Sequence, residues 1–485
     1  MQKIIGRTAE KATLQRAYES GKPELVVVYG RRRVGKTFLI REFFDGKLAF
    51  YHTGLSIFEV SMANQKDSQL QNFTSSLRQY GWNLPSTHTD WLSAFDNLRM
   101  LLEDKMEREP GRRQVVFIDE LPWMDTPRSG FLAALEHFWN GWGAGQTNLM
   151  LIVCGSATAW ISSHLLHNKG GLYGRMTREI KLHPFSLYEA EQFYQEQGIE
   201  LDRYAQLQLY MMLGGIPYYM SYVQRGQSVE QTIDNLFVSR NARLADELEQ
   251  LFDSLFTNHH DCMKIIRCLA TRKTGYTRKE IAEKTGLPYG GGLTNTLKSL
   301  AESDFIQRYE YYGLPSKEDR YRLVDFFSLS VLKVLEKQVE ADSDVWKGRF
   351  DKRAMDAWYG IAFESLCWNH ISQIKKALGI AAVNTVEFSW RAEGTDEYPG
   401  AQIDLIIRRA DRVINICEMK FCIGDYLLDK ADDASLRNKI SAYQRLTRCK
   451  EAIHPILVTT YGLIPNKYSH NIQKTVTMDD LFASE

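Results

Sequence analysis

The chain has 485 residues, of which 44% are hydrophobic and 25% are charged, with 60 basic and 60 acidic side chains. This length exceeds what one hydrophobic core usually supports, so we expect three or four domains, and the composition argues against long disorder. The balanced charge excludes a general attraction to nucleic acid, so any such contact must come from a local basic patch.

The chain shows no targeting or membrane signal. Its first residues, MQKIIGRTAEK, contain no apolar core of signal-peptide length, and no window reaches the roughly 18 consecutive apolar residues of a membrane helix. The seven cysteines are scattered and make no C-x-x-C pair, which argues against a disulfide framework and against a zinc site. We therefore expect a cytoplasmic protein with no membrane partner.

The first predicted elements are a strand, a glycine-containing loop and a helix. In ELVVVYGRRRVGKTFLIREFF, residues 24–44, a β-branched run ends at Gly30 and an amphipathic stretch begins near Lys36. The segment between them fits G-x-x-x-x-G-K-[ST] in full. Backbone N–H groups of such a loop face phosphate oxygens, and the helix N-terminus adds positive partial charge. We expect ATP here, with Lys36 reaching the β- and γ-phosphates and Thr37 holding Mg²⁺. The cofactor-binding loop comprises Gly30, Arg31, Arg32, Arg33, Val34, Gly35, Lys36 and Thr37.

Two later strands are expected to complete this site. In QVVFIDELPWMD, four apolar residues precede Asp119 and Glu120. Asp119 is predicted to hold the magnesium through water, and Glu120 to orient and deprotonate the attacking water. In LMLIVCGSATAW a third strand ends at Gly155, so Ser156 is predicted to lie between the other strand ends and to sense the γ-phosphate. A simple turn residue is an equally weighted alternative for Ser156.

The segment GLYGRMTREIKLHPFS supplies one further candidate, Arg175. Its guanidinium could stabilise the charge that develops during phosphoryl transfer, and a surface ion pair is an equally weighted alternative.

Taken together, IIGRTAEKATLQRAY, GRRRVGKT, VVFIDE, CGSATAW and GRMTREIKLHPFS resemble the archaeal-type branch of AAA+-like P-loop ATPases, which is also widespread in bacteria. The resemblance runs along essentially the whole chain. It implies ATP binding with hydrolysis, places Gly6 and Arg7 near the base, and places the Gly-Gly-x-Pro segment 214–217 in a helical lid. Such ATPases often form rings, but Arg175 alone does not establish one, so a homo-oligomer stays open.

The middle of the chain is predicted to hold a helical lid, residues 186–256, followed by a winged helix-turn-helix, residues 257–335. TRKEIAEKTG starts with Thr277 and has Glu280 three residues later, which is a capping-box pattern. A second helix and two strands around a polar turn follow. Between residues 264 and 322, twelve Lys/Arg outnumber seven Asp/Glu by five. This favours duplex DNA contact through Lys298 and the wing. A structural coupler is an equally weighted alternative, and a protein-docking surface is a third.

After a charged linker near residues 336–352, a last domain is predicted over residues 346–485. GAQIDLIIRRADRVINICEMKF reads as two strands joined by a tight turn at residues 410–412. Antiparallel partners then sum to 822, which sets Asp404 opposite Glu418, and Lys420 lies on the same face. Two adjacent carboxylates repel each other unless a cation such as Mg²⁺ lies between them. Lys420 could then position or deprotonate a water for attack on phosphorus.

The same residues resemble the PD-(D/E)XK nuclease superfamily, whose core is a helix with Glu, a strand with Asp and a strand with (D/E)-x-K. The resemblance implies Glu364, Asp404 and Glu418 as metal ligands, Lys420 as the catalytic lysine and Gln444 as an auxiliary polar group. Ile403, where many members have proline, departs from the pattern. A strand E-x-K is also typical of a solvated ion pair, and Glu364 is alternatively a helix-surface acid.

The sequence thus predicts an α/β chain with four parts: a P-loop NTPase domain (residues 1–185), the lid, the winged helix-turn-helix and a restriction-endonuclease-like α/β domain. The leading hypothesis is an ATP-binding and ATP-hydrolysing protein that acts on DNA, with a Mg²⁺-dependent nuclease-like C-terminal domain. The alternative is a nucleotide-switch regulator whose tail binds nucleic acid or protein without cutting.

Overall fold

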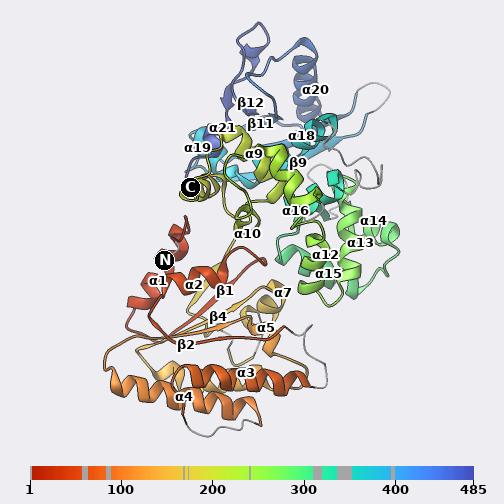
Figure 1. Ribbon diagram of the computed structural model, residues 1–485. Helices are drawn as coiled ribbons and strands as arrows, with labels where there is room; N and C mark the ends of the chain where they lie inside the picture. Colours follow the sequence, from red (N-terminus) through yellow and green to blue (C-terminus); the bar gives the residue numbers. More distant parts are fainter. Residues whose placement is uncertain are drawn as a thin grey trace. The chain divides into compact units, whose positions relative to one another are not determined.

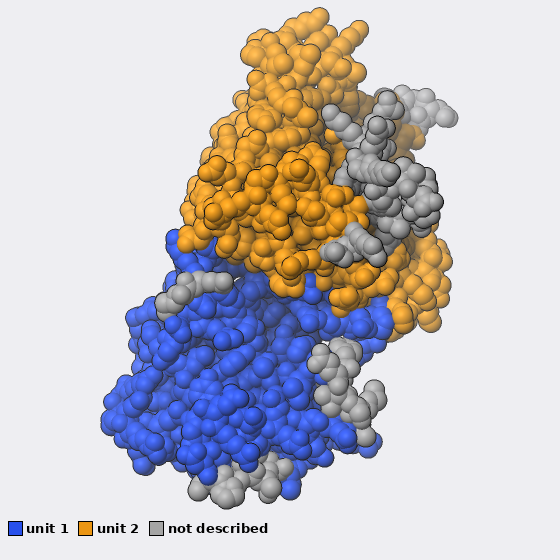
Figure 2. Space-filling model, in the orientation of Figure 1, with its two compact units in different colours: residues 1–184, 251–259, 298–303 blue, residues 185–250, 260–297, 304–485 orange. Residues whose placement is uncertain are grey.

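The computed structural model describes residues 3–56, 64–83, 89–167, 170–172, 174–239, 242–309, 319–335, 352–394 and 399–484. The chain forms two compact units, each built from several segments (Figure 2). The first unit contains residues 1–184, 251–259 and 298–303, and the second contains residues 185–250, 260–297 and 304–485. Across the described ranges, each helix is too short or too polar to cross a membrane.

A five-stranded parallel sheet forms the centre of the first unit, in the order β2-β3-β4-β1-β5. The strands are β1 (Glu24–Tyr29), β2 (Leu48–Thr53), β3 (Gln114–Asp119), β4 (Leu149–Gly155) and β5 (Arg178–Lys181). Every residue of β1, β3 and β4 is buried, as expected for parallel strands covered on both faces. The order places β4 between β1 and β3, so the three predicted strand ends lie side by side as the sequence indicated.

Helices cover both faces of this sheet. The helices are α1 (Thr8–Glu19), α2 (Lys36–Phe43), α3 (Gln65–Gln79), α4 (Trp91–Arg108), α5 (Leu121–Met124), α6 (Phe131–Gly141) and α7 (Thr158–Ile161). Helices α3 and α4 lie side by side along one face, and α1 and α2 lie on the other (Figure 1). Leu25 and Val27 join Phe73 and Trp91 in one buried cluster, because alternate residues of a strand point to the same face.

The second unit begins with a helical region, as the apolar spacing predicted. Its helices are α8 (Leu187–Glu196), α9 (Arg203–Leu213), α10 (Pro217–Met220) and α11 (Val229–Ile233), and α12 (Glu247–Leu255) crosses the boundary between the units. In the Gly-Gly-x-Pro segment, the Gly215 carbonyl accepts a hydrogen bond from the Phe185 amide at 2.8 Å. A Cβ on Gly215 would lie 2.4 Å from the Phe185 carbonyl oxygen, so this close approach requires glycine.

A small antiparallel sheet follows, with the strands in the order β6-β8-β7. Its strands are β6 (Tyr276–Thr277), β7 (Ile306–Tyr309) and β8 (Arg320–Leu323), and its helices are α13 (His259–Ala270), α14 (Arg278–Thr285), α15 (Gly291–Glu302) and α16 (Phe326–Ser330). The capping box of Thr277 and Glu280 is confirmed, as are the two later strands. The predicted polar turn at residues 310–318 lies outside the described residues, as does most of the linker.

The last part of the second unit contains a mixed sheet in the order β13-β12-β11-β10-β9. Its strands are β9 (Thr385–Ala392), β10 (Ala401–Arg409), β11 (Val413–Lys420), β12 (Ala452–Thr459) and β13 (Lys474–Val476). Its helices are α18 (Lys352–Asn369), α19 (Ile371–Ala377), α20 (Lys430–Thr447) and α21 (Met478–Leu481). Leu405 pairs with Cys417 and Ile406 with Ile416, which confirms the predicted register. Helix α20 packs on the face of Ile414 and Ile416, whereas α18 also contacts β11.

A buried imidazole joins two segments of this second unit. His370, which is 1% exposed, donates from Nδ1 to the Leu366 carbonyl at 2.9 Å and accepts at Nε2 from the Leu187 amide at 3.1 Å. Both bonds require the neutral ring, because protonated Nε2 would be a donor facing a donor. Burial lowers the pKa of His370 to about 4.

This arrangement predicts a pH-dependent stability. The unfolded chain binds a proton near pH 6.5 and the folded chain only near the lowered pKa of about 4, so stability falls as pH falls through this window. The full effect is roughly 3 kcal/mol. Urea unfolding between pH 4.5 and 7.5 should show a shallower pH dependence in His370→Gln than in wild type. Exposed His470→Gln is the matched control, and buried His52, whose pKa is lowered to about 3, accounts for a residual slope. An unchanged slope in His370→Gln would contradict this assignment.

Candidate nucleotide site and candidate cation site

The predicted phosphate-binding loop, residues 30–37, joins β1 to the N-terminus of α2. Lys36 is the first residue of α2 and is 5% exposed. Its ammonium donates to the carbonyl oxygens of Gly30 and Arg31, each at 3.0 Å. Carbonyl oxygens carry no full negative charge, so they leave the buried ammonium suited to a phosphate.

The backbone of this loop needs its glycines. Gly30 has φ +145°, and a Cβ there would lie 2.2 Å from the Leu182 carbonyl oxygen. Gly35 has φ +92° and directly precedes α2. Arg7 donates to the Val34 carbonyl at 3.3 Å, so the predicted Gly-Arg segment near the N-terminus contacts the loop itself. Within the loop, Arg31 and Val34 are buried, and Arg32 and Arg33 are half-buried.

Asp119, at the end of β3, lies beside the start of α2. Its Oδ2 accepts a hydrogen bond from the Thr37 hydroxyl at 2.6 Å. Burial and the neighbouring Glu120 carboxylate raise the pKa of Asp119, and the hydrogen bond from Thr37 opposes them. A cation bound at this pair would favour the ionised carboxylate.

Glu120 and Ser156 contact each other at the neighbouring strand ends. The Ser156 amide donates to Glu120 Oε2 at 3.2 Å, and the Ser156 hydroxyl donates to Oε1. Glu120 has φ +48°, in the left-handed region that non-glycine residues seldom adopt. Such strain is typical of functional positions. Ser156 therefore holds the side chain predicted to activate water.

Arg175 lies in a turn before β5, and its side chain is exposed. Its backbone amide donates to the Leu172 carbonyl at 3.0 Å. The structure does not bring the side chain of Arg175 into the network of Lys36, Thr37, Asp119, Glu120 and Ser156.

These residues fit ATP with Mg²⁺. Mg²⁺ is usually held by one or two protein oxygens together with water and substrate phosphates, and the Thr37 hydroxyl and Asp119 carboxylate supply such oxygens at one point. The buried Lys36 ammonium lies on the same loop. Thr37 and Asp119 would thus hold Mg²⁺, and Lys36 with the loop amides would hold the phosphates.

The second group of predicted residues lies in the C-terminal part, where a β-bulge shapes the surroundings of Asp404. The pairing of β10 with β9 shifts between Ile403 and Ile406. The Asp404 carbonyl instead accepts from the Ser389 hydroxyl at 2.8 Å and from the Trp368 indole at 3.1 Å. Bulges are common beside active sites because they redirect a side chain.

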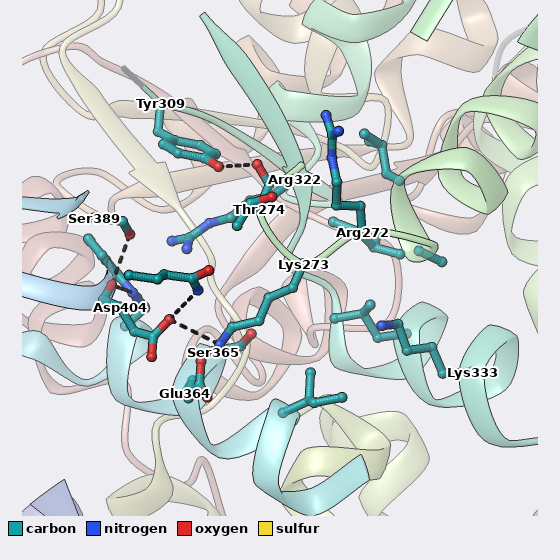
Figure 3. Close-up of a pocket in the computed structure, with 17 residues that line it drawn as sticks. Arg272, Lys273, Thr274, Tyr309, Arg322, Lys333, Glu364, Ser365, Ser389 and Asp404 are labelled. Carbon is teal, nitrogen blue, oxygen red and sulfur yellow. Dashed lines mark hydrogen bonds and ion pairs between the residues drawn. The ribbon is translucent and has the colours of Figure 1, made fainter. Parts of the chain in front are cut away.

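A lysine that the sequence analysis did not single out contacts two of the predicted carboxylates. Lys273 Nζ lies 3.2 Å from Asp404 Oδ1 and forms an ion pair with Glu364 (Figure 3). Gln402 also donates to Asp404 Oδ1, at 2.8 Å. Burial lowers the pKa of Lys273, whereas Asp404 acts to raise it. All four residues belong to the second unit and line one pocket.

Glu418 forms ion pairs with Lys439 and Lys420. It shares its face of β11 with Ile416, toward α20, and Lys439 of α20 lies 2.6 Å from Glu418 Oε2. Lys420 Nζ lies 3.4 Å from Glu418 Oε1 and 3.7 Å from Asp432 Oδ1. Gln444 lies on α20, as its helical spacing predicted.

The confirmed register of β10 and β11 therefore does not bring the side chains of Glu364, Asp404 and Glu418 together at one point. Across the described ranges, no group of three or more His, Cys, Asp or Glu side chains is placed to hold a metal ion. Glu364 and Asp404 meet at Lys273, and Glu418 meets Lys439 and Lys420. The side chains as arranged do not form one ligand set for a divalent ion.

Sequence reasoning missed Lys273, Lys439 and Arg322. Lys273 is 131 positions from Asp404, and nothing in its local sequence marks it. Arg322 lies 4.6 Å from the centre of the Trp368 ring and 5.2 Å from that of Tyr309. For Lys273 and Arg322 the sequence signal was the basic excess of residues 264–322, which did not identify individual side chains.

The first site lies in the part of the chain that matches a protein-family model. Residues 5–223 match the model of an ATPase domain found predominantly in Archaea. The uncharacterized protein MJECL04 of Methanocaldococcus jannaschii is 24% identical over 414 residues, covering 83% of this chain and 84% of that protein. The Walker-type ATPase PABY2304 of Pyrococcus abyssi is 18% identical with a TM-score of 0.49, covering 68% of this chain and 96% of that one. The ORC2 protein of Aeropyrum pernix, solved in ADPNP-ADP complexes, is 14% identical with a TM-score of 0.46, covering 70% of this chain and 95% of that one.

The matched residues include the whole phosphate-binding loop together with Asp119, Glu120 and Ser156. Residues 5–223 of this chain are therefore similar to an ATPase domain found predominantly in Archaea.

Proposed function

We propose that the protein hydrolyses ATP and acts on DNA through a winged helix and a nuclease-like C-terminal domain. The observation that carries the ATPase part is the network at three adjacent strand ends. Lys36 and Thr37 follow β1, Asp119 and Glu120 close β3, and Ser156 follows β4. Such clustering at the carboxyl ends of parallel strands is where α/β proteins bind their ligands.

Each side chain has a defined task in this proposal. Bound Mg²⁺ would neutralise charge on the transferred phosphoryl group. Lys36 would bind the phosphates through its ammonium, and Thr37 and Asp119 would hold the metal. Glu120 orients the attacking water and accepts its proton, and Ser156 fixes the Glu120 carboxylate. Arg175 remains a candidate for stabilising transferred charge.

The DNA part rests on the order of the elements that follow the helical lid. Helices α13 to α15 with the sheet β6-β8-β7 have the element order of a winged helix-turn-helix. Helix α18, the strands β10 and β11 and helix α20 follow one another in the order expected of a PD-(D/E)XK core, with α19 and β9 between α18 and β10. Glu364, Asp404, Glu418 and Lys420 lie on α18, β10 and β11, the elements on which that core carries its acids and lysine.

One experiment tests the whole proposal. Labelled duplex, branched and single-stranded DNA and RNA are incubated with Mg²⁺ or Mn²⁺, with and without ATP, for wild type, Lys36→Ala and Glu418→Ala. We expect cleavage that is lost in Glu418→Ala and that responds to ATP only when Lys36 is present. Binding of the same substrates should weaken steeply between low and high salt if phosphate contacts dominate. Failure to bind any duplex at any salt concentration would contradict a role on DNA.

A second function, a nucleotide-switch regulator that binds without cutting, is favoured by one specific observation. Each carboxylate predicted to bind metal in the C-terminal part already pairs with a lysine of the same chain: Glu364 and Asp404 with Lys273, and Glu418 with Lys439. Ion pairs of this kind satisfy the acids without a metal. Intact ATP hydrolysis with no cleavage of any substrate would establish this regulator in place of the nuclease.

A further inference from the structure

The lysine that meets the two carboxylates comes from a different element than they do. Lys273 lies in the turn between α13 and β6, whereas Glu364 lies on α18 and Asp404 on β10. In Figure 3 the Lys273 side chain reaches across the pocket, so that its nitrogen lies between the two acids. This is the place that a divalent cation would take in a site built from the same carboxylates.

The turn that carries Lys273 is held from three directions. Gly275 has φ +60°, and a Cβ there would lie 2.1 Å from the Tyr321 carbonyl oxygen. Arg272 donates to the Gly275 carbonyl at 2.7 Å, and the Tyr309 hydroxyl donates to the Thr274 carbonyl. These contacts hold the backbone that directly follows Lys273, and the ion pairs with Glu364 and Asp404 hold its side chain.

A second cation reinforces the same charge pattern. Arg322 lies over the Trp368 ring, and the Trp368 indole donates to the Asp404 carbonyl. Burial lowers the pKa of Arg322, and Tyr309 and Asp404 act to raise it. Lys273 and Arg322 therefore add positive charge beside Glu364 and Asp404, and Arg272 and Lys333 also line this pocket. The negative charge of the two carboxylates is thus offset without a metal.

We propose that Lys273 is a built-in counter-ion that occupies the cation position between Glu364 and Asp404 and excludes divalent metal from it. This inference rests on the nuclease-like domain of the proposed function. The position of Lys273, in the turn between α13 and β6, then determines whether the C-terminal site can bind a metal. A divalent ion binds Glu364 and Asp404 only when Lys273 is displaced or removed.

The experiment measures Mn²⁺ binding by the loss of the free-ion electron paramagnetic resonance signal, on the full chain and without nucleotide. Wild type, Lys273→Met, Lys273→Met/Asp404→Asn and the exposed control Lys279→Ala are compared. Methionine keeps the length of the side chain and removes its charge. We expect Lys273→Met to bind one additional Mn²⁺ at least about tenfold more tightly than wild type, and the double variant to lose this ion. Lys279→Ala should match wild type.

A second readout does not depend on affinity. Without metal, Lys273→Met should melt at a lower temperature than wild type, because two close carboxylates lose their shared cation. Mn²⁺ should restore the Tm of Lys273→Met and leave that of wild type unchanged. Restoration by Mn²⁺ also shows that the variant is folded, and Lys273→Gln repeats the measurement with a polar side chain.

Two outcomes would overturn the inference, and they are distinguishable. If wild type binds this Mn²⁺ as tightly as Lys273→Met, the lysine excludes nothing, but the metal site of the proposed nuclease stands. If neither protein binds it, Glu364 and Asp404 form no metal site, and the metal-dependent part of the proposed function fails together with the inference. ATP hydrolysis is unaffected by either outcome.

Discussion

Glu120→Gln is expected to lower the rate of ATP hydrolysis by at least about 100-fold while nucleotide affinity stays within about twofold of wild type. Glutamine has nearly the same shape and still accepts a hydrogen bond from Ser156, but it cannot take a proton from water. Phosphate and metal contacts belong to Lys36, Thr37 and Asp119, so binding should survive. Phosphate release and equilibrium binding of a fluorescent ATP analogue measure the two quantities separately.

Two further variants sharpen this prediction. Ser156→Ala removes the hydroxyl that donates to Glu120 and should reduce hydrolysis by about tenfold, because the carboxylate remains but is less well oriented. Exposed Glu107→Gln on α4 removes the same charge away from the site and should have no effect. If Glu120→Gln hydrolysed ATP at the wild-type rate, Glu120 would not be the base.

Gly30→Ala is expected to destabilise the first unit by about 3 kcal/mol or more and to weaken nucleotide binding sharply. A Cβ would lie 2.2 Å from the Leu182 carbonyl oxygen, and both atoms belong to backbone that cannot rotate away. The loop must therefore shift, and with it the carbonyl groups that hold Lys36. Urea unfolding and nucleotide titration measure the two effects.

Gly46→Ala provides the matched control. Gly46 also has a positive φ, +66°, but nothing lies within 4 Å of its would-be Cβ. Gly46→Ala should lower the free energy of unfolding by about 1 kcal/mol, because alanine must adopt the left-handed conformation. It should leave nucleotide affinity unchanged. Equal effects of the two substitutions would show that backbone conformation, and not the approach of Leu182, makes Gly30 necessary.

The nucleotide site was predictable because its parts are short and local. The loop at residues 30–37 encodes its own turn, and the strands before Asp119 and Ser156 are uninterrupted apolar runs. The register of β10 with β11 was equally local, because a tight turn determines it. Within these limits, sequence alone identified the residues that meet at the ends of β1, β3 and β4.

The C-terminal site was not predictable to the same degree, because its partners come from distant parts of the chain. The bulge at Asp404 depends on donors from Ser389 and Trp368, which pairwise strand register does not reveal. Lys273 reaches Asp404 across 131 positions. The acidic motif indicates that Glu364 and Asp404 could bind a cation. It does not reveal that Lys273 of the same chain already pairs with them.

The buried imidazole of His370 has a consequence for truncated forms of the protein. It connects Leu187, near the start of the second unit, to Leu366, in the helix that opens the C-terminal part. Ending the chain near residue 340 would leave the Leu187 amide without its acceptor and would uncover apolar side chains of α9 that contact α18. The sequence suggests a series of independent domains, but the C-terminal part packs on α9 and is not an independent domain. Experiments on an isolated fragment would report on a damaged surface, so activities should be assigned with point variants of the whole chain.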